Sequence, residues 1–252
     1  MQKYFKINAD RLSIQCKVYY DNLKHINTAI IFGHGFTGHK DNRAAERFAV
    51  RALKKNSNLA IITFDWPGHG DDTSNKLTLE KCDKYLNHVI AYVQSQWNVN
   101  KIFGYATSFG GYLFLRYIAE YNTPFSKIAL RCPAVNMYSI LKDAIMTEEE
   151  YSKIEKGKNV IIGFDRKVEV TPQFLDELKK ADITKNDYNN HAKDILIIHG
   201  TKDQIVPFDD VESFAKKNKI GFIAVDDADH RFLDPQKMDV AIAEILKMFD
   251  LQ

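Results

Sequence analysis

Residues 101–112 read KIFGYATSFGGY, and this stretch decides the fold. An apolar run typical of a buried strand ends at Thr107, and two glycines then open an amphipathic helix. A serine at such a strand-to-helix turn, with small residues two positions before and after it, is the pattern of a nucleophile elbow. Small neighbours let the strand and the helix approach each other around a strained serine. Ala106 stands where glycine is usual and Gly110 completes the pattern, so we predict that Ser108 is a nucleophile.

Similar units of strand, loop and helix precede this stretch. Residues 28–32 and 59–64 are continuously apolar, as expected for strands covered on both faces, and a glycine-containing loop follows each of them. After the first loop, Asp41 is a plausible N-cap for a helix. After the second, a helix is predicted over about residues 79–96. Such units in series imply a mostly parallel sheet flanked by helices, which is an α/β fold.

The same pattern returns near the carboxyl end, and a short hairpin opens the chain. Residues 2–7 and 13–20 alternate apolar and polar side chains, which suits an antiparallel pair at the edge of the sheet. The later strands are predicted at residues 127–130, 194–200 and 221–225, with a helix at about 210–218 and a last helix that begins at Asp234-Pro235 and buries Val240, Ile242, Ile245, Leu246 and Phe249.

Residues 134–193 do not fit a strand-and-helix unit. This segment holds an acidic triplet, two short β-like runs and a helix with Thr171 as N-cap and Pro172 at its first position. Because it also keeps aromatic and β-branched side chains, we interpret it as a folded insertion rather than a disordered linker. The domain prediction is therefore a core of residues 1–133 and 194–252, with residues 134–193 as an inserted cap or lid.

Charge and cysteine content exclude several classes of partner. The 252 residues include 35 basic and 33 acidic side chains, and a net charge of +2 gives no electrostatic footprint for nucleic acid or anionic lipid. No apolar stretch has the length of a signal peptide or a membrane span, so we expect a cytoplasmic protein. Three widely spaced cysteines fit neither a disulfide framework nor a zinc site, and we expect buried free thiols. Composition is compatible with a homo-oligomer.

Two further residues complete a candidate catalytic set. A serine hydroxyl needs a base to take its proton, and His230 follows the last predicted strand in a short acidic turn. The imidazole needs a carboxylate to hold its tautomer, and Asp203 follows the preceding strand. All three candidates lie beyond carboxyl ends of strands, where catalytic groups of parallel sheets gather. The order Ser108, Asp203, His230 is the order expected of an α/β-hydrolase.

Other acids and histidines compete for these roles. Asp209 and Asp210 lie where a helix is predicted to begin, and we interpret them as capping residues. Asp65 follows its own strand, but its Pro-Gly-His-Gly setting is typical of a tight structural turn. Among the histidines, the loop residues His34 and His69 are interpreted as structural or as organising the loops beside the site, as is His199, which we expect to be packed at a strand end.

A tetrahedral intermediate also needs backbone N–H donors where negative charge develops. Phe109 follows the predicted nucleophile directly and supplies one donor. We assign the second donor to Phe36, in the glycine-containing loop after the first parallel strand. Loss of one such donor costs on the order of 3 kcal/mol of transition-state stabilisation.

Five segments together resemble the α/β-hydrolase superfamily. They are His34-Gly35-Phe36, Asp65-x-x-Gly68-His69-Gly70, Ala106-x-Ser108-x-Gly110-Gly111, His199-Gly200-x-x-Asp203-x-x-Val206-Pro207, and Asp229-His230 before a terminal helix. Within the superfamily, the HGFTG loop and the compact insertion resemble bacterial cinnamoyl (feruloyl) esterases and related small carboxylesterases. The resemblance implies an α/β-hydrolase fold and hydrolysis of small acyl or hydroxycinnamoyl esters through an acyl-enzyme on Ser108, with a small-molecule ester as substrate.

Several alternatives stay open or are disfavoured at this point. The same three residues could serve an acyltransferase, a thioesterase or a serine peptidase, and a non-catalytic binding module could keep the fold as a scaffold. No H-x-x-x-H or H-E-x-x-H pair occurs, which disfavours a metal site, and the loop at residues 33–38 lacks the nucleotide-binding patterns. We therefore expect no cofactor and no metal. A dehalogenase on this fold would need a carboxylate at position 108.

Overall fold

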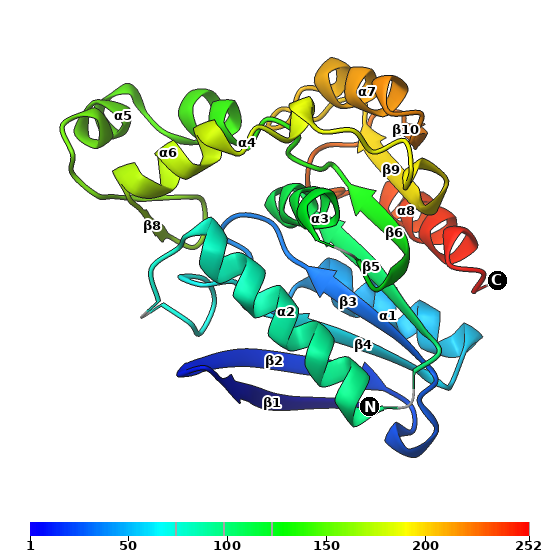
Figure 1. The fold of residues 1–252 in the computed structure, drawn as a ribbon. Coiled ribbons are helices and arrows are strands. Elements are labelled where there is room, and N and C mark those ends of the chain that lie inside the picture. Colours follow the sequence, from blue (N-terminus) through cyan, green and yellow to red (C-terminus); the bar gives the residue numbers. More distant parts are fainter. Residues whose placement is uncertain (74, 98, 122, 252) are drawn as a thin grey trace.

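An eight-stranded sheet forms the centre of the molecule. The computed structural model describes residues 1–73, 75–97, 99–121 and 123–251. The strand order across the sheet is β1-β2-β4-β3-β5-β6-β9-β10 (Figure 1). The strands are β1 (Gln2–Ala9), β2 (Leu12–Tyr20), β3 (Thr28–Gly33), β4 (Leu59–Phe64), β5 (Lys101–Thr107), β6 (Phe125–Arg131), β9 (Ile195–Gly200) and β10 (Gly221–Val225).

Strand direction follows the hydrophobic patterns. The alternating strands β1 and β2 form an antiparallel hairpin, and β2 is also antiparallel to β4. The continuously apolar strands β3, β4 and β9 are buried at every position. β3 pairs in parallel with β4 and β5, and β9 pairs in parallel with β6 and β10. Every strand from β4 to β10 across the sheet therefore runs in one direction, and its loops share one edge. The predicted α/β fold class is confirmed.

Helices cover both faces of the sheet. Side chains of α2, α3 and α7 join one hydrophobic core, and those of α1 and α8 join a second core on the opposite face. In Figure 1, α2 and α3 lie in front of the strands and α1 and α8 lie behind them. The bounds of these helices are α1 (Arg43–Lys55), α2 (Leu79–Gln96), α3 (Phe109–Glu120), α7 (Phe208–Lys217) and α8 (Pro235–Met248).

The local signals for helix ends were partly right. Asp234 caps α8 and Pro235 occupies its first turn, as predicted. The N-cap of α1 is Asn42 rather than Asp41, because the Asn42 side chain accepts the N–H groups of the first turn. Val240 is 47% exposed and does not belong to the buried stripe of α8, which contains Met238, Ala241, Ile242, Ile245 and Leu246.

Most of the segment of residues 134–193 lies beyond the carboxyl edge of the sheet, and its last residues lead back to the start of β9 (Figure 1). It holds the antiparallel pair β7 (Val160–Ile162) and β8 (Val168–Val170). Thr171 caps α6 and Pro172 opens it, as predicted. Its helices are α4 (Met137–Ser139), a π-helical turn (Ile140–Ile145), α5 (Glu148–Glu155), α6 (Pro172–Lys180) and two 3-10 turns (Ile183–Lys185 and Ala192–Asp194); a further 3-10 turn (Leu23–His25) precedes β3.

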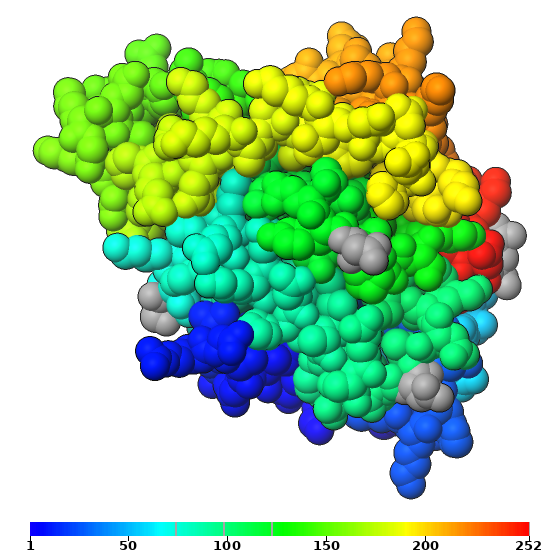
Figure 2. Space-filling model, viewed as in Figure 1, coloured from blue at the N-terminus to red at the C-terminus, as the bar shows by residue number. Residues whose placement is uncertain are grey.

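This segment packs as part of the molecule. Phe174 and Leu178 of α6 belong to the same hydrophobic core as α2 and α3. In Figure 2 the green and yellow-green atoms of the segment form one corner of the surface, next to the yellow residues that lead back to β9. Within the described ranges, no helix is both long enough and apolar enough to cross a membrane.

Candidate active site

Ser108 occupies the sharp turn between β5 and α3. Its backbone angles are φ 52° and ψ −118°, a region that non-glycine residues rarely adopt. The Ser108 N–H donates to the carbonyl of Arg131 at 3.1 Å, and its own carbonyl accepts the N–H groups of Tyr112 and Ala134, each at 3.1 Å. These bonds hold the strained residue in place. The half-buried side chain is thereby presented at the carboxyl edge of the sheet.

The small residues around Ser108 are required by close backbone approach. A β-carbon on Gly110 would overlap the carbonyl oxygen of Gly33 and lie 2.7 Å from that of His34. Ala106 pairs in register with Gly33 of β3. A methyl group is therefore accommodated at position 106, because its neighbour on β3 carries no side chain.

The structure brings the three sequence-predicted residues together. His230 Nε2 lies 3.0 Å from Ser108 Oγ, and His230 Nδ1 lies 2.7 Å from Asp203 Oδ2. An ionised carboxylate only accepts hydrogen bonds, so we assign the proton to Nδ1 and leave Nε2 free to accept the serine O–H. Ser108, His230 and Asp203 come from the loops after β5, β10 and β9.

Asp203 is held as a buried carboxylate. Its side chain has no exposed surface, and Oδ1 accepts the N–H groups of Ile205 at 2.9 Å and Val206 at 2.8 Å. Burial by itself raises the pKa of Asp203, but the hydrogen bonds from His230 and from these two N–H groups outweigh it and leave the pKa below its usual range.

The competing acids have other partners. Asp209 and Asp210 lie in the first turn of α7, but neither caps it, because the N-cap position is Pro207. This corrects the prediction that they cap the helix. Asp65 is fully buried, and its oxygens accept the backbone N–H groups of Lys40 at 2.6 Å and Asp71 at 2.9 Å. Asp65 therefore joins the loop after β3 to the loop after β4.

The two predicted oxyanion donors lie on either side of the serine turn. Phe109 is the first residue of α3, so its N–H has no acceptor within the helix and lies at the positive end of the helix dipole. Phe36 follows Gly35, and a β-carbon on Gly35 would lie 3.1 Å from Ser108 Cβ and 3.6 Å from Ser108 Oγ. The loop after β3 thus lies against the serine. Among the described residues, neither N–H has a hydrogen-bond acceptor.

His34 fixes this loop from below. Its Nδ1 lies 2.8 Å from the Gly35 carbonyl, its Nε2 accepts the Trp66 N–H at 3.2 Å, and its own carbonyl accepts the Trp66 indole N–H at 3.0 Å. Complete burial lowers the pKa of His34 to about 3, so the ring is neutral with its proton on Nδ1. His34 is therefore a structural residue of the loop, as the sequence indicated.

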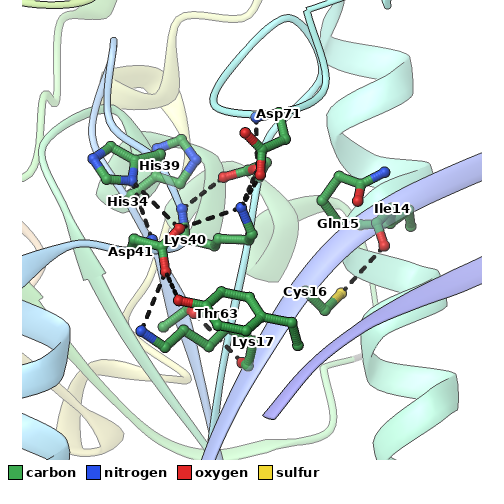
Figure 3. Close-up of polar contacts among 12 residues, drawn as sticks. Ile14, Gln15, Cys16, Lys17, His34, His39, Lys40, Asp41, Thr63 and Asp71 are labelled. Atoms are coloured by element: carbon green, nitrogen blue, oxygen red, sulfur yellow. Dashed lines mark hydrogen bonds and ion pairs between the residues drawn. The ribbon is translucent and has the colours of Figure 1, made fainter. Parts of the chain in front are cut away.

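Charged side chains fix the far end of the same loop (Figure 3). The Lys40 ammonium group contacts Asp71 and Asp41, and Asp41 also accepts a hydrogen bond from Lys17 at 3.2 Å. The Tyr4 hydroxyl donates to Asp41 at 2.7 Å. Asp41 therefore ties the loop to β1 and β2, which is the role it has in place of capping α1.

Three residues that sequence reasoning did not assign to the site surround the Asp203–His230 pair. Arg131 Nη1 donates to the His230 carbonyl at 3.2 Å, and His199 Nε2 lies 3.3 Å from Asp203 Oδ2. Cys132 Sγ lies within 4.8 Å of a carboxylate oxygen of Asp203 and of a ring nitrogen of His230, so these three residues could be considered as metal ligands. Arg131 ends β6, Cys132 follows it, and His199 lies near the end of β9, so their position at strand ends was the available signal.

The group of Cys132, Asp203 and His230 is a poor metal site. Burial, with the nearby Asp203 charge, raises the pKa of the Cys132 thiol far above its ordinary value, so the sulfur stays protonated. The Asp203 and His230 atoms are already hydrogen-bonded to each other at 2.7 Å. Metal binding would need a thiolate and would break that contact. All three cysteines are free and buried, as predicted.

The turn between β7 and β8 reaches the edge of the site. Asp165 pairs with Arg231, next to His230, at 3.5 Å. Gly163 packs so closely on Thr37, next to Phe36, that a β-carbon there would overlap the threonine methyl group. Phe164 lies between these two contacts in sequence and is 52% exposed. The hairpin therefore touches both loops that flank Ser108.

Two cavities of about 190 Å³ and 340 Å³ are partly lined by residues of the 134–193 segment. Both are lined by Val135 and Asn136, which directly follow the residue that donates to the Ser108 carbonyl. The first is also lined by Tyr112, Met137, Tyr138, Leu178, Lys179, Ala181 and Asp182, and the second by Thr184, Asp210, Ser213, Phe214 and Lys217.

Part of the chain is similar in sequence to known lipases. A stretch of 112 residues is 30% identical to monoacylglycerol lipase ABHD6 of Bos taurus and 31% identical to that of Homo sapiens. The match covers 44% of this chain and about a third, 32%, of each relative's length.

Similar solved structures cover nearly the whole chain. Est1E from Butyrivibrio proteoclasticus has 18% sequence identity and a TM-score of 0.75, over 98% of this chain and 99% of that one; a second Est1E structure, with 17% identity, holds ferulic acid. A putative hydrolase from Agrobacterium vitis S4 has 17% identity and a TM-score of 0.74, over 98% of both chains. These likenesses establish the fold.

Family membership comes from the sequence match. Residues 24–157, just over half of the chain, match the Hydrolase_4 family, described as "Serine aminopeptidase, S33". The matched range includes the loop after β3 and the Ser108 turn. The chain therefore belongs to the Hydrolase_4 family of serine hydrolases and has the α/β-hydrolase fold.

Proposed function

We propose that this protein is a serine carboxylesterase that hydrolyses small acyl esters through an acyl-enzyme on Ser108. The observation that carries the proposal is the unbroken chain of contacts from Ser108 Oγ to His230 and from His230 to Asp203, at 3.0 Å and 2.7 Å. A serine next to a base that is itself oriented by a carboxylate has the arrangement of an activated nucleophile.

In the proposed reaction His230 Nε2 takes the Ser108 proton as Oγ attacks the ester carbonyl carbon. The N–H groups of Phe36 and Phe109 stabilise the negative charge that forms on the carbonyl oxygen. His230 then gives the proton to the leaving alcohol, which leaves the acyl group on Ser108. A water molecule deprotonated by His230 attacks the acyl-enzyme and releases the acid, and the proton returns to Ser108.

We further propose that residues 134–193 act as a cap that selects the acyl group. The support is the β7–β8 turn, which contacts the loops on both sides of Ser108 and carries the exposed ring of Phe164. An exposed aromatic ring at the edge of the site suits an apolar or aromatic acyl group. The ferulic acid held by Est1E is consistent with a hydroxycinnamoyl group, and we expect Phe164→Ala to raise KM for aromatic esters more than for acetyl esters.

One experiment tests the reaction class. Purified protein is assayed against methyl ferulate, p-nitrophenyl esters of increasing chain length and acyl-CoA, and Ser108→Ala is assayed in parallel. The proposal requires ester hydrolysis that disappears in Ser108→Ala. If the variant keeps full activity, Ser108 is not the nucleophile. Asp210→Asn, at a residue outside the proposed machinery, serves as the control.

The family description motivates a second candidate, an aminopeptidase with the same three residues. Aminoacyl p-nitroanilides added to the panel distinguish amide from ester cleavage. A non-catalytic binding module is tested by labelling with a fluorophosphonate, because only an activated serine reacts rapidly. Failure of the wild-type protein to label would remove both enzymatic candidates.

A further inference from the structure

His199 lies directly behind the proposed acid, and the proposed reaction does not use it. Its side chain is completely buried near the end of β9. Nε2 lies 3.1 Å from the carbonyl oxygen of Val206 and 3.3 Å from Asp203 Oδ2. Both neighbours are acceptors, so the proton of the neutral ring is on Nε2. The ring therefore presents an N–H to the turn that carries Asp203.

The same turn is held from the other side by its own backbone. The Val206 N–H donates to Asp203 Oδ1 at 2.8 Å, and the Val206 carbonyl accepts the His199 N–H. His230 Nδ1 lies 2.7 Å from Asp203 Oδ2. Each carboxylate oxygen thus has an N–H directed at it, with the His199 proton beside Oδ2. Rotation of the carboxylate away from His230 would separate it from these donors.

Packing alone does not account for a histidine here. Within the described residues, Nδ1 of His199 is buried with no hydrogen-bond partner, and the ring lies beside that of Phe208 at a centroid distance of 5.9 Å. An apolar side chain would fill the space without burying an unpaired nitrogen. The free-energy cost of burying Nδ1 is offset only if the Nε2–H group makes a hydrogen bond that an apolar side chain could not make.

A neutral ring also suits the surrounding charges. The titratable and charged groups near His199 are Asp203, His230 and Arg131. Burial lowers the pKa of His199 and outweighs the attraction of Asp203. The ring thus acts as a dipole rather than a cation, and it does not oppose the positive charge that His230 acquires during the reaction.

We propose that His199 is a positioning residue, whose Nε2–H holds the Asp203 turn so that Oδ2 stays aligned with His230 Nδ1. The proposal rests on the proposed function, because alignment matters only if His230 acts as a base. Loss of the donor should leave substrate binding unchanged and slow every step in which His230 takes or gives a proton.

The test compares three substitutions by the second-order rate of fluorophosphonate labelling and by kcat and KM on a p-nitrophenyl ester. His199→Leu removes the donor, and His199→Asn keeps a polar but shorter side chain that cannot reach the turn. His199→Gln places an amide N–H near the position of Nε2. We expect Leu and Asn to lower the labelling rate and kcat about tenfold, equivalent to about 1.4 kcal/mol, with unchanged KM, and Gln to restore most of the loss.

The pH profile separates positioning from general damage to the fold. A carboxylate that loses a hydrogen bond attracts a proton on its partner imidazole more strongly, so the acid limb of the labelling rate should move to higher pH in the Leu and Asn variants. Rates are expressed per active site, with thermal melts as a check on folding. His25→Leu, at an exposed position before β3, is the matched control and should label like wild type.

Two results would overturn the inference. If folded His199→Leu or His199→Asn labels at the wild-type rate with the wild-type pH profile, His199 does not position the acid. If Gln is as slow as Leu, the lost feature is ring shape rather than the N–H. A wild-type protein that does not label at all refutes the proposed function instead, and the positioning role falls with it.

Discussion

The strained backbone at Ser108 leads to a prediction about stability that does not depend on substrate. At φ 52° and ψ −118°, a residue with a β-carbon is in a sparsely populated region, at a cost of about 1 to 3 kcal/mol. Glycine adopts positive φ readily. Ser108→Ala keeps the β-carbon and the strain, whereas Ser108→Gly relieves it. Both variants lose the hydroxyl contact with His230, so that term cancels in the comparison.

The magnitude follows from two opposing terms. Relief of strain stabilises the glycine variant by about 2 kcal/mol. Glycine loses more backbone entropy on folding than alanine, which costs about 0.5 to 1 kcal/mol. We therefore expect Ser108→Gly to be more stable than Ser108→Ala by about 1 kcal/mol. For a chain of this size, that difference corresponds to about 2 °C or slightly more in Tm.

Chemical denaturation of the two inactive variants measures the difference directly. The matched control is the same pair of substitutions at Ser152, inside the helix α5 (Glu148–Glu155). There the order should reverse, with glycine less stable than alanine by about 1 kcal/mol because of helix propensity. If Ser108→Gly proves no more stable than Ser108→Ala, while the Ser152 pair behaves as expected, the turn is not strained and the reasoning is wrong.

Three further predictions follow from the site and its supports. Asp203→Asn should lower kcat by a factor on the order of 10³ to 10⁴, since the amide no longer fixes the histidine tautomer, whereas Asp209→Asn should match wild type in the same ester assay. Gly110→Ala should lower the free energy of unfolding by about 3 kcal/mol or prevent soluble expression, despite the helix propensity of alanine, because its β-carbon meets backbone carbonyls at the end of β3; wild-type stability in urea would contradict this. Burial lowers the pKa of His34 and of His69 to about 3, against about 6.5 in the unfolded chain. The unfolded state therefore takes up protons that the folded state does not, and unfolding in urea at pH 5 should require about 2 kcal/mol less per histidine than at pH 7. His69→Phe should remove about half of that pH dependence, and a stability that is equal at both pH values would exclude buried neutral rings.

The fold could be predicted because its signals are local. The uninterrupted apolar runs at residues 28–32 and 59–64 require burial on both faces, and the structure has the parallel strands β3 and β4 there. At Thr171-Pro172 and Asp234-Pro235, the first side chain accepts a backbone N–H of the first helical turn, and the proline at the next position has a fixed φ that suits a helix. Such features depend on a few consecutive residues, so one sequence is sufficient to find them.

Errors occurred where two local solutions were nearly equal. Asp41 and Asn42 can each cap a helix. Asn42 caps α1, because the Asp41 side chain accepts hydrogen bonds from Tyr4 and Lys17 of the distant strands β1 and β2. Val240 is apolar, but the buried stripe of α8 passes through Ala241 and Ile242 instead. For Asp41 the deciding contacts come from elements far away in sequence.

The candidate site shows the same limit at finer scale. The order of Ser108, Asp203 and His230 and their places after strands follow from the chain itself, because loops at one edge of a parallel sheet must meet. What the sequence could not give is the direction of each side chain within that edge. His199 ends an apolar strand and reads as core, and only the folded turn shows that its Nε2 lies beside Asp203 rather than away from it. Residues that reach a site through another residue leave no motif of their own, so their discovery depends on coordinates and on variants that change one hydrogen bond at a time.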